Sequence, residues 1–374
     1  MHAGKPLDRA HTYRHIAARQ GTLPILSNVL LRAEARALTL VTTNLELGMT
    51  YRLRGKVEED GVCTVNAKLF TDIVHLLPKD RVDVTVAGTE LELQCRGNGT
   101  KVRGMDAGEF PLIPTIEQTT NVRVDAEALR GALAQTAFAV ASGESRPELG
   151  GVLWAFDGQT MTIAATDSYR LAERKIACTG TELPKGTSVI VPGRTIGELL
   201  RILGISQDDG SVGAEVVLNP TASQLCITVG GLDIVSRLID GTYPDYTQIL
   251  PRTWTTRALV SRTELATAAR AASLFARTGV NDVHLRFLPN EKQCIVRSEN
   301  AQLGEHQAIL DAEVSGDGIT TILNARYLLD GLAAIPGDRI AIEATGPVAP
   351  VVLKPETDAA EGAGYVYVIM PIKQ

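Results

Sequence analysis

The chain has 374 residues, of which 44% are hydrophobic, 4% aromatic and 21% charged, and its formal net charge is −6. This length exceeds one ordinary core and predicts two or three domains with mainly aliphatic interiors. No apolar stretch reaches the about 20 residues of a membrane-spanning helix, and Met1–Pro6 lacks the apolar run of a secretory signal. A negative net charge alone argues against a nucleic-acid binder. The five cysteines form no Cys-x-x-Cys pair, which predicts buried thiols in a reducing cytoplasm.

Apolar residues spaced three and four apart predict six amphipathic helices along the chain. In chain order they cover residues 8–19, 68–77, 126–141, 194–203, 262–277 and 326–335. A strand signal follows each first helix, in Leu38–Val41, Met161–Ile163 and Cys294–Val296. Another follows each second helix, in Val82-x-Val84, Val216-x-Leu218 and Ile340-x-Ile342. The pattern therefore occurs three times.

The three copies are spaced by about 125–130 residues, which is the size of a domain rather than of a solenoid unit. We expect α+β domains at residues 1–120, 121–254 and 255–374, joined by Pro- and Thr-rich linkers at 114–121 and 250–256. Each domain is expected to pack two helices on one face of an antiparallel sheet of about eight short strands. The first copy departs from the pattern, because Gly4 and Pro6 disfavour a strand before its first helix.

No catalytic constellation is visible: the chain has no Walker loop, no GxGxxG and no GxSxG. His11 and His15 lie four apart on a predicted helix, but no third metal ligand is near them in sequence, so we interpret them as exposed side chains. Asp208 and Asp209 lie beside Gly210 and predict a turn rather than an acid–base pair. These absences favour a scaffold over an enzyme.

Five segments, in order and spanning nearly the whole chain, together resemble the bacterial DNA sliding clamps, the beta subunits of DNA polymerase III. They are Thr22–Leu31 (TLPILSNVLL), Gly108–Pro111 (GEFP), Ala165–Ala172 (ATDSYRLA), Gly241–Tyr246 (GTYPDY) and Tyr367–Ile372 (YVIMPI). The resemblance implies three DNA-clamp domains that form a closed ring as a head-to-tail homodimer. It implies a non-catalytic, cytoplasmic processivity factor without a cofactor that encircles double-stranded DNA regardless of sequence. Its implied partners are the replicative DNA polymerase, the clamp loader and repair proteins, bound through short peptide motifs.

The C-terminal tail is unusually apolar, ending Val368-Ile369-Met370-Pro371-Ile372 before only two polar residues. Such a tail must be buried or line an apolar groove. The resemblance implies that it helps to form the peptide-binding cleft. The implied cleft residues are Leu149, Thr166, Ser168, Tyr169, Arg170, Leu171, Pro244, Ile249, Val368, Met370, Pro371 and Ile372. Core packing is the alternative for Leu149, Leu171 and Ile249 taken singly. The family varies at Ser168-Tyr169 and often carries an arginine near Gln248, so partner preference is expected to differ.

The predicted helices, with the first helix of the second copy extended to residue 146, carry twelve basic and seven acidic residues although the chain as a whole is acidic. A basic lining inside an acidic exterior suits a ring that slides on DNA, since diffuse attraction to phosphate is independent of sequence. The alternative is that these residues are ordinary helix formers on solvated faces. At positions resembling the family's DNA-contacting loops, we expect Arg19, Gln20 and Arg146 to touch the template.

The resemblance implies a dimer interface between the first domain of one chain and the third of its partner. The implied interface residues are Lys68, Lys101, Arg103, Leu274, Phe275, Glu299 and Glu305, with the basic residues facing the acidic ones. Two other classes of protein are left open: a repeat enzyme whose site forms only on folding, and an interaction scaffold that does not encircle DNA. The first would need clustered carboxylates for metal ions, and the basic helices argue against the second.

Overall fold

The structure is a computed structural model that describes residues 23–34, 36–78, 80–113, 120–143, 145–180, 183–208, 215–356 and 364–373. The chain forms two compact units. Unit one contains Met1–Glu127, Thr179–Glu182 and Gly197–Leu238, and unit two contains Ala128–Cys178, Leu183–Ile196 and Ile239–Gln374. The domain boundaries expected at 120 and 254 stay a prediction, because strands of neighbouring copies pair with each other inside each unit.

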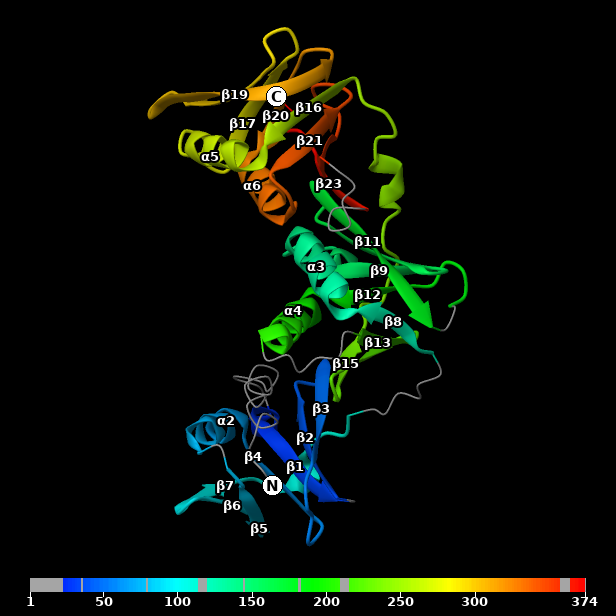
Figure 1. Ribbon diagram of the computed structural model, residues 1–374, viewed down its shortest axis with the longest axis vertical. Coiled ribbons are helices and arrows are strands. Elements are labelled where there is room, and N and C mark those ends of the chain that lie inside the picture. Colours follow the sequence, from blue (N-terminus) through cyan, green and yellow to red (C-terminus); the bar gives the residue numbers. More distant parts are fainter. Residues whose placement is uncertain are drawn as a thin grey trace. The chain divides into compact units, whose positions relative to one another are not determined.

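The elements of the second and third copies follow the same order, and the described elements of the first copy follow it from β1 onward (Figure 1). The first copy contains β1 (Asn28–Glu34), β2 (Ala37–Thr43), β3 (Leu47–Arg54), β4 (Gly61–Asn66), α2 (Ala67–Leu76), β5 (Asp83–Ala87), β6 (Glu90–Cys95) and β7 (Asn98–Arg103). The second contains β8 (Val122–Asp125), α3 (Ala126–Thr136), β9 (Gly151–Asp157), β10 (Thr160–Thr166), β11 (Arg170–Gly180), β12 (Ser188–Pro192), α4 (Gly193–Asp208), β13 (Glu215–Pro220), β14 (Gln224–Val229) and β15 (Leu232–Arg237). The third contains β16 (Thr256–Ser261), α5 (Arg262–Ser273), β17 (Asp282–Leu288), β18 (Gln293–Asn300), β19 (Gly304–Gly316), β20 (Ile319–Asn324), α6 (Ala325–Ala334), β21 (Arg339–Ala344), β22 (Val351–Pro355) and β23 (Tyr365–Ile369).

Five of the six predicted helices are confirmed, with different ends. The helix predicted for 126–141 ends as α3 at Thr136, whose hydroxyl donates to Ala132 O at 2.9 Å, and the short 3-10 helix Ala137–Ala139 follows. The helix predicted for 262–277 ends as α5 at Ser273. The turn predicted at Asp208 is wrong, because α4 continues through Asp208.

Several predictions lie outside the described residues. They are the helix at 8–19 with His11, His15, Arg19 and Gln20, the absence of a strand in Met1–Pro6, and Asp209. Within the described ranges, no group of three or more His, Cys, Asp or Glu side chains is arranged to hold a metal ion. No helix in the described part of the chain is long and apolar enough to cross a membrane. The five cysteines are buried and unpaired, as predicted.

The strand registers of the described residues are antiparallel, and two of these pairings join one copy to the next. In unit one, β15 of the second copy pairs with β3 of the first, from Leu232–Tyr51 to Ser236–Leu47. In unit two, β23 of the third copy pairs with β11 of the second, from Arg170–Ile369 to Arg174–Tyr365. Each sheet is thereby continued from one copy into the next by main-chain hydrogen bonds.

Segments distant in sequence meet in the core of the first copy. Ile25, Leu26 and Leu30, which belong to the Thr22–Leu31 segment, pack against Phe110 of the Gly108–Pro111 segment. All four side chains are buried. Burial of four large apolar side chains stabilises this contact by roughly 1.5–3 kcal/mol each. The two segments therefore belong to one structural unit.

In the third copy, α5 and α6 lie side by side against the sheet (Figure 1). Gly331 of α6 lies over the ring of Tyr367 on β23, and a Cβ added there would lie 2.2 Å from the Tyr367 Cε1 atom. Tyr367 is fully buried and its hydroxyl donates to Tyr327 O at 2.8 Å, so the ring has no room to move aside. The glycine at 331 thus permits the close approach of α6 and β23.

We predict that Gly331→Ala destabilises the protein by about 2 kcal/mol through overpacking against Tyr367. The matched control is Gly131→Ala in α3, where an added Cβ meets nothing within 4 Å. That change should stabilise by up to about 1 kcal/mol, because alanine is the better helix former. Urea unfolding midpoints measure both, and a Gly331→Ala variant as stable as the parent would contradict the packing argument.

Candidate functional site

A tight turn between β10 and β11 is the first part of the candidate site. Thr166 Oγ1 donates to Arg170 O at 2.6 Å and accepts from Ser168 N at 3.1 Å. Asp167 Oδ1 accepts from the backbone N–H groups of Tyr169 and Arg170, both at 3.0 Å. Ser168 adopts a positive φ of 77°, which is costly for a non-glycine residue. The two side-chain acceptors hold that conformation, so the turn is defined by Thr166 and Asp167.

Arg170 connects this turn to the third copy. Its Nε donates to Asp167 Oδ2 at 3.0 Å, its Nη1 to Asp330 Oδ2 on α6 at 2.5 Å, and its Nη2 to Phe138 O at 2.7 Å. The guanidinium carbon lies 4.5 Å from the centre of the Tyr327 ring. Burial alone would lower the pKa of Arg170, but the hydrogen bond to Asp330 and the interactions with Tyr367 and Asp167 together outweigh it, and the pKa is raised. The cation is therefore fixed at every accessible pH.

The C-terminal tail continues from β23 along the same turn. Met370 N donates to Tyr169 O at 2.8 Å, which extends the β11–β23 pairing by one bond. Ile372 N then donates to Ile322 O of β20 at 2.8 Å. Pro371, which has no N–H, lies between these two bonds and is buried. We call this region, made of Thr166–Leu171 and Val368–Ile372, the tail junction.

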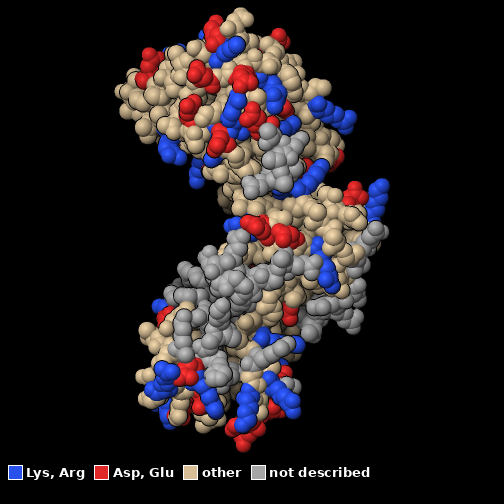
Figure 2. Space-filling model, viewed as in Figure 1, with Lys and Arg blue, Asp and Glu red and all other residues tan. Residues whose placement is uncertain are grey.

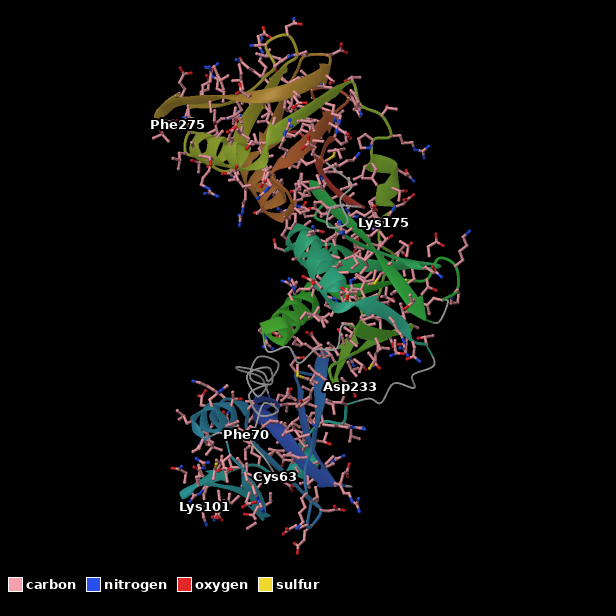
Figure 3. All side chains as sticks on the ribbon, viewed as in Figure 1. Cys63, Phe70, Lys101, Lys175, Asp233 and Phe275 are labelled. Atoms are coloured by element: carbon pink, nitrogen blue, oxygen red, sulfur yellow. The ribbon has the colours of Figure 1, made fainter. Side chains whose placement is uncertain are left out.

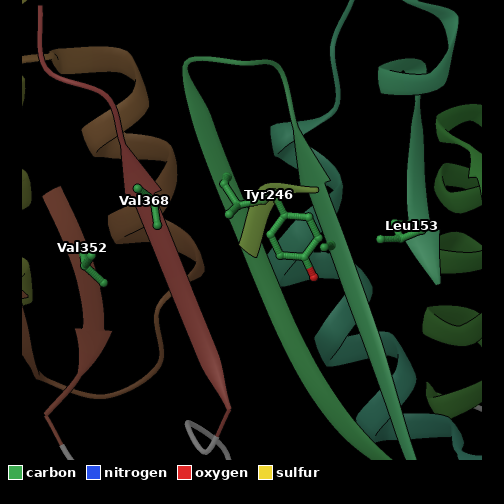
Figure 4. Packing of buried hydrophobic residues seen from close by; sticks show 6 residues of the cluster. Leu153, Tyr246, Val352 and Val368 are labelled. Atoms are coloured by element: carbon green, nitrogen blue, oxygen red, sulfur yellow. The ribbon is translucent and has the colours of Figure 1, made fainter. Parts of the chain in front are cut away.

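A buried apolar cluster underlies the tail junction (Figure 4). It joins Leu153, Ala164 and Leu171 of the second copy to Val352 and Val368 of the third, with Tyr246 between them. Tyr243, Leu250 and Val366 pack around it half-buried. The second and third copies thus share a core at this point in addition to the strand pairing.

Two tyrosines of the Gly241–Tyr246 segment attach it to the same place. Tyr243 Oη accepts from Thr166 N at 3.0 Å, and Tyr246 Oη donates to Glu173 Oε2 at 2.7 Å. Burial raises the pKa of both phenols, so both stay neutral. The segments that carried the resemblance in the second and third copies therefore converge on one surface.

The predicted cleft residues divide into a buried base and an exposed rim. Leu149, Thr166, Leu171, Val368 and Pro371 are buried. Tyr169 is 64% exposed and Ile249 is 41% exposed, while Pro244, Met370 and Ile372 are half-buried and Ser168 is exposed. Leu149 and Leu171 are buried, and this position agrees with core packing, the alternative to a role in the cleft.

Two polar residues near the junction have local partners. Arg146 Nη1 donates to Ser168 Oγ at 3.2 Å and its Nε to Glu148 Oε1 at 3.2 Å. The side chain of Arg146, for which we expect a contact with DNA, thus lies against the turn between β10 and β11. Gln248, where the family often has an arginine, donates from Nε2 to Asp245 Oδ2 at 2.9 Å.

The residues expected at a dimer interface are distributed over both units. Lys68 is exposed on α2, and Lys101 and Arg103 lie on β7, with Lys101 within 3.6 Å of Glu90 and 3.7 Å of Glu92 (Figure 3). In unit two, Arg297 binds both Glu299 and Glu305, at 2.6 and 2.7 Å. Leu274 is 72% exposed, and Phe275 stacks on His306 of β19 with ring centres 6.1 Å apart.

The basic residues on the helices differ in how they are engaged. Arg262 donates to Gly337 O at 2.6 Å, Arg277 pairs with Asp282 at 2.8 Å, and Arg201 pairs with Glu198 at 2.9 Å. Four others are exposed, and among the described residues the side chain of none of them has a hydrogen-bond or ion-pair partner. They are Lys68, Arg194, Arg270 and Arg326. On the face in Figure 2, by contrast, acidic and basic side chains of the third copy alternate.

Comparison with known proteins gives matches over almost the whole chain. Three family models match in order: the N-terminal domain of the DNA polymerase III beta subunit at residues 7–114, its central domain at 123–245 and its C-terminal domain at 247–373. A beta sliding clamp of Staphylococcus aureus is 28% identical over 362 residues, which cover 94% of this chain and 93% of the relative.

Solved structures give the same result. The DNA polymerase sliding clamp of Bacillus subtilis superposes with a TM-score of 0.89 at 26% identity, over 100% of this chain and 98% of that chain. The DNA polymerase III beta subunit of Pseudomonas aeruginosa gives 0.90 at 27% identity, over 98% and 97%. Fold and sequence thus define an α+β protein of three clamp domains. The chain belongs to the DNA polymerase III beta subunit family: it is a sliding clamp, a non-catalytic processivity factor of the polymerase.

Some residues of the tail junction have no signal in the sequence. Asp330, Phe138 and Tyr327 contact Arg170 from 160, 32 and 157 positions away. Asp330 lies on a helix and resembles any solvated carboxylate there. Tyr243 lies in the Gly241–Tyr246 segment. Because a buried tyrosine usually finds a hydrogen-bond partner for its hydroxyl, this residue type was the one signal in the sequence for the contact with Thr166.

We predict that Arg170 and Asp330 are energetically coupled. Arg170→Ala should destabilise the protein by about 2 kcal/mol, because Asp167 and Phe138 O lose a charged donor. Asp330→Ala should cost less, and the double variant should fall short of the sum by about 1 kcal/mol. Urea unfolding of all four proteins measures the coupling. Arg194→Ala, with its exposed side chain, is the control and should change stability by less than about 0.5 kcal/mol; strictly additive effects at 170 and 330 would refute the link.

Proposed function

We propose that two copies of this chain close head to tail into a ring around double-stranded DNA. We further propose that the tail junction binds short peptide motifs of the replicative polymerase, the clamp loader and repair proteins. The observation that carries the proposal is the repeated edge pairing: β3 with β15 and β11 with β23. The relatives that match the chain are named as sliding clamps, which agrees with such a ring.

The edge pairing supports a dimer because one pair of equivalent strand edges has no partner within the described part of the chain. The strand equivalent to β3 and β11 in the third copy is β19, and the strand equivalent to β15 and β23 in the first copy is β7. Within the described residues, β7 pairs with β6 alone, and the Gly304–Asp311 part of β19 pairs with β18 alone. Joining β7 of one chain to β19 of its partner, twice, uses both remaining edges and closes the ring.

The register of the proposed β7–β19 pairing follows from the turns that precede the equivalent strands. Val229 faces Leu232 at the turn before β15, and Cys95 faces Asn98 at the turn before β7, so Lys101 holds the position of Val235. Val235 pairs with Gly48 of β3. This is the fourth position counted from each turn.

Gly48 lies at the end of its hairpin, where it faces Thr43. In the third copy the last pair of the corresponding hairpin is Asn300–Gly304, and Glu299 faces Glu305 one pair before it. Lys101 of one chain is thereby expected beside Glu305 of its partner, with Arg103 and Glu299 as diagonal neighbours. Opposite charges across neighbouring strands stabilise a pairing and set its register.

Exposed apolar side chains are present near both edges. Leu274 at the end of α5, Leu303 before β19 and Ile309 on β19 are 72%, 64% and 56% exposed, and Leu76 of α2 is 85% exposed. Covering such side chains stabilises an interface by about 25 cal/mol per Å² of apolar surface. A dimer would therefore be held by main-chain bonds, apolar contact and charge.

We predict that Lys101→Glu and Glu305→Lys each weaken the dimer by about 1 kcal/mol, a roughly fivefold rise in Kd. The two changes in one chain should restore the Kd to within about twofold of the parent, since the opposite charges face each other again. Sedimentation equilibrium at low salt measures this, with Lys185→Glu as the control. A double variant no tighter than the single ones would refute the register.

DNA encirclement is supported by the unpaired basic residues on the helices. Lys68, Arg194 and Arg326 each lie near the start of their helix, and Arg270 lies on α5. Because these cations are not neutralised by described neighbours, each is available to attract phosphate. Such contacts release counterions and give binding that falls with salt and does not depend on sequence. The expected roles of Arg19, Gln20 and Arg146 in template contact belong to this proposal.

Peptide binding is supported by the form of the tail junction. A rim of exposed side chains, Tyr169 and Ile249, and of half-buried ones, Pro244, Met370 and Ile372, lies beside a buried base. Methionine adapts to varied apolar partners, and a tyrosine offers both a ring face and a hydroxyl. The base is held by the Arg170 network, so the surface is preorganised for binding.

We predict that Met370→Ala weakens binding of a clamp-binding peptide from the replicative polymerase by about tenfold, because one anchoring side chain is lost. Deletion of residues 370–374 should weaken it further, since the Met370–Tyr169 bond is lost too. Fluorescence titration measures affinity and sedimentation confirms the dimer. The control is Val348→Ala, an exposed site elsewhere in the third copy. Unchanged affinity in the Met370 variant, or loss of the dimer in either, would count against the assignment.

A further inference from the structure

Two glutamates lie opposite each other near the end of the β18–β19 hairpin. Glu299 of β18 faces Glu305 of β19 in the antiparallel register, and both side chains are exposed. Like charges that face each other across neighbouring strands destabilise the pairing. Arg297 offsets this repulsion, because its Nη2 nitrogen donates to Glu299 Oε2 at 2.6 Å and to Glu305 Oε2 at 2.7 Å. One guanidinium therefore pairs with both carboxylates within the single chain.

The strand that the proposed dimer brings to this hairpin is also neutralised within its own chain. On β7, Lys101 Nζ lies 3.6 Å from Glu90 Oε1 and 3.7 Å from Glu92 Oε2, and both glutamates belong to the neighbouring strand β6. Glu92 faces Lys101 directly, and Glu90 faces Arg103. The basic residues expected on one side of the contact thus have carboxylates beside them before any partner arrives.

Closure of the ring therefore exchanges ion pairs rather than creating them from separate charges. Lys101 of one chain is expected beside Glu305 of its partner, but Glu305 is already bound to Arg297, and Lys101 already lies beside Glu92. Arg297 and Lys101 would also repel each other across the contact. The electrostatic gain on closure is consequently smaller than the gain from two carboxylates without a cation of their own.

The open ring benefits from the same arrangement. A ring that encircles DNA has to open before duplex DNA can enter, and opening exposes both sides of one contact. Without Arg297, opening would leave Glu299 and Glu305 facing each other with no cation from the partner between them. With Arg297, each carboxylate keeps a charge-assisted hydrogen bond in the open state.

We propose that Arg297 is a positioning residue that substitutes for the partner's basic side chains when the ring is open, and so keeps the closed dimer weak enough to be opened. It acts through Glu299 and Glu305. The inference rests on the ring and on the pairing of β7 with β19 proposed above. It adds that ion pairs inside each chain, as well as those between chains, set the strength of the contact.

Arg339 supplies a matched control in the same copy. Like Arg297 it binds two glutamates, with Nη2 2.7 Å from Glu313 Oε1 and Nη1 3.3 Å from Glu356 Oε1. Glu313 lies on the part of β19 that pairs with β16 of the same chain, where it faces Leu259. This second cluster is therefore outside the proposed contact, and Arg339→Gln removes the same charge and frees two glutamates without affecting the dimer.

The test measures the dimer Kd of the full chain at low salt, from the loss of energy transfer when donor- and acceptor-labelled protein is diluted. Arg297→Gln should lower the Kd about fivefold, because the repulsion between the two glutamates is then relieved only by the partner. Arg297→Lys, which keeps the charge, and Arg339→Gln should both stay within about twofold of the parent. In a chain that also carries Lys101→Glu, Arg297→Gln should give no tightening, because the cation expected beside Glu305 is absent.

Salt separates this electrostatic effect from a structural one. At about 1 M salt, where the Debye length falls to about 3 Å, the tightening by Arg297→Gln should disappear. A dimer that is unchanged or weaker in Arg297→Gln, an equal tightening in Arg339→Gln, or a tightening that persists at high salt overturns the inference. In each of these results the parent is a dimer, so the proposed ring stands. A parent that is a monomer at every concentration contradicts the ring itself, and the inference with it.

Discussion

Antiparallel pairing of strand edges between successive copies is the interaction on which the rest of the structure depends. It joins β15 to β3 and β23 to β11, and it uses main-chain groups, so three copies with diverged side chains can all form it. Around the second of these pairings lie the shared apolar cluster, the Arg170 network and the tail junction. An unpaired strand edge exposes main-chain N–H and C=O groups that can pair with other chains and cause aggregation. A specific partner for each remaining edge prevents this.

The same constraint makes the three copies unequal. The second and third copies share a core and the tail junction, because β23 lies on β11. The first and third copies present the edges, β7 and β19, on which the proposed dimer is built. One repeated unit thus supplies different surfaces according to which edge is covered and by what.

Sequence periodicity predicted the helices well, since residues such as Leu328 and Leu332 mark one buried face. It misplaced their ends, because the end of α3 depends on the Thr136 hydroxyl bonding back to Ala132 O, which has no periodic signal. The unusual tail was recognised from composition, and the structure places Val368 in the core and Met370 at the rim. The Arg170–Asp330 contact was beyond sequence reasoning, since it spans 160 positions and both residues are common on surfaces. The pairings of β15 with β3 and of β23 with β11 were likewise beyond sequence reasoning, because the sequence does not show which strands pair or in which register.

Topological retention on DNA tests the central claim most directly. The protein is loaded by the clamp loader onto a nicked circular plasmid, separated from free protein by gel filtration, and the plasmid is then cut once with a restriction enzyme. If edge pairing closes a ring, sedimentation shows a dimer, the protein stays with the circle in high salt, and it leaves when the DNA is made linear. A monomer, or a protein that leaves circular and linear DNA at the same rate, would contradict the account.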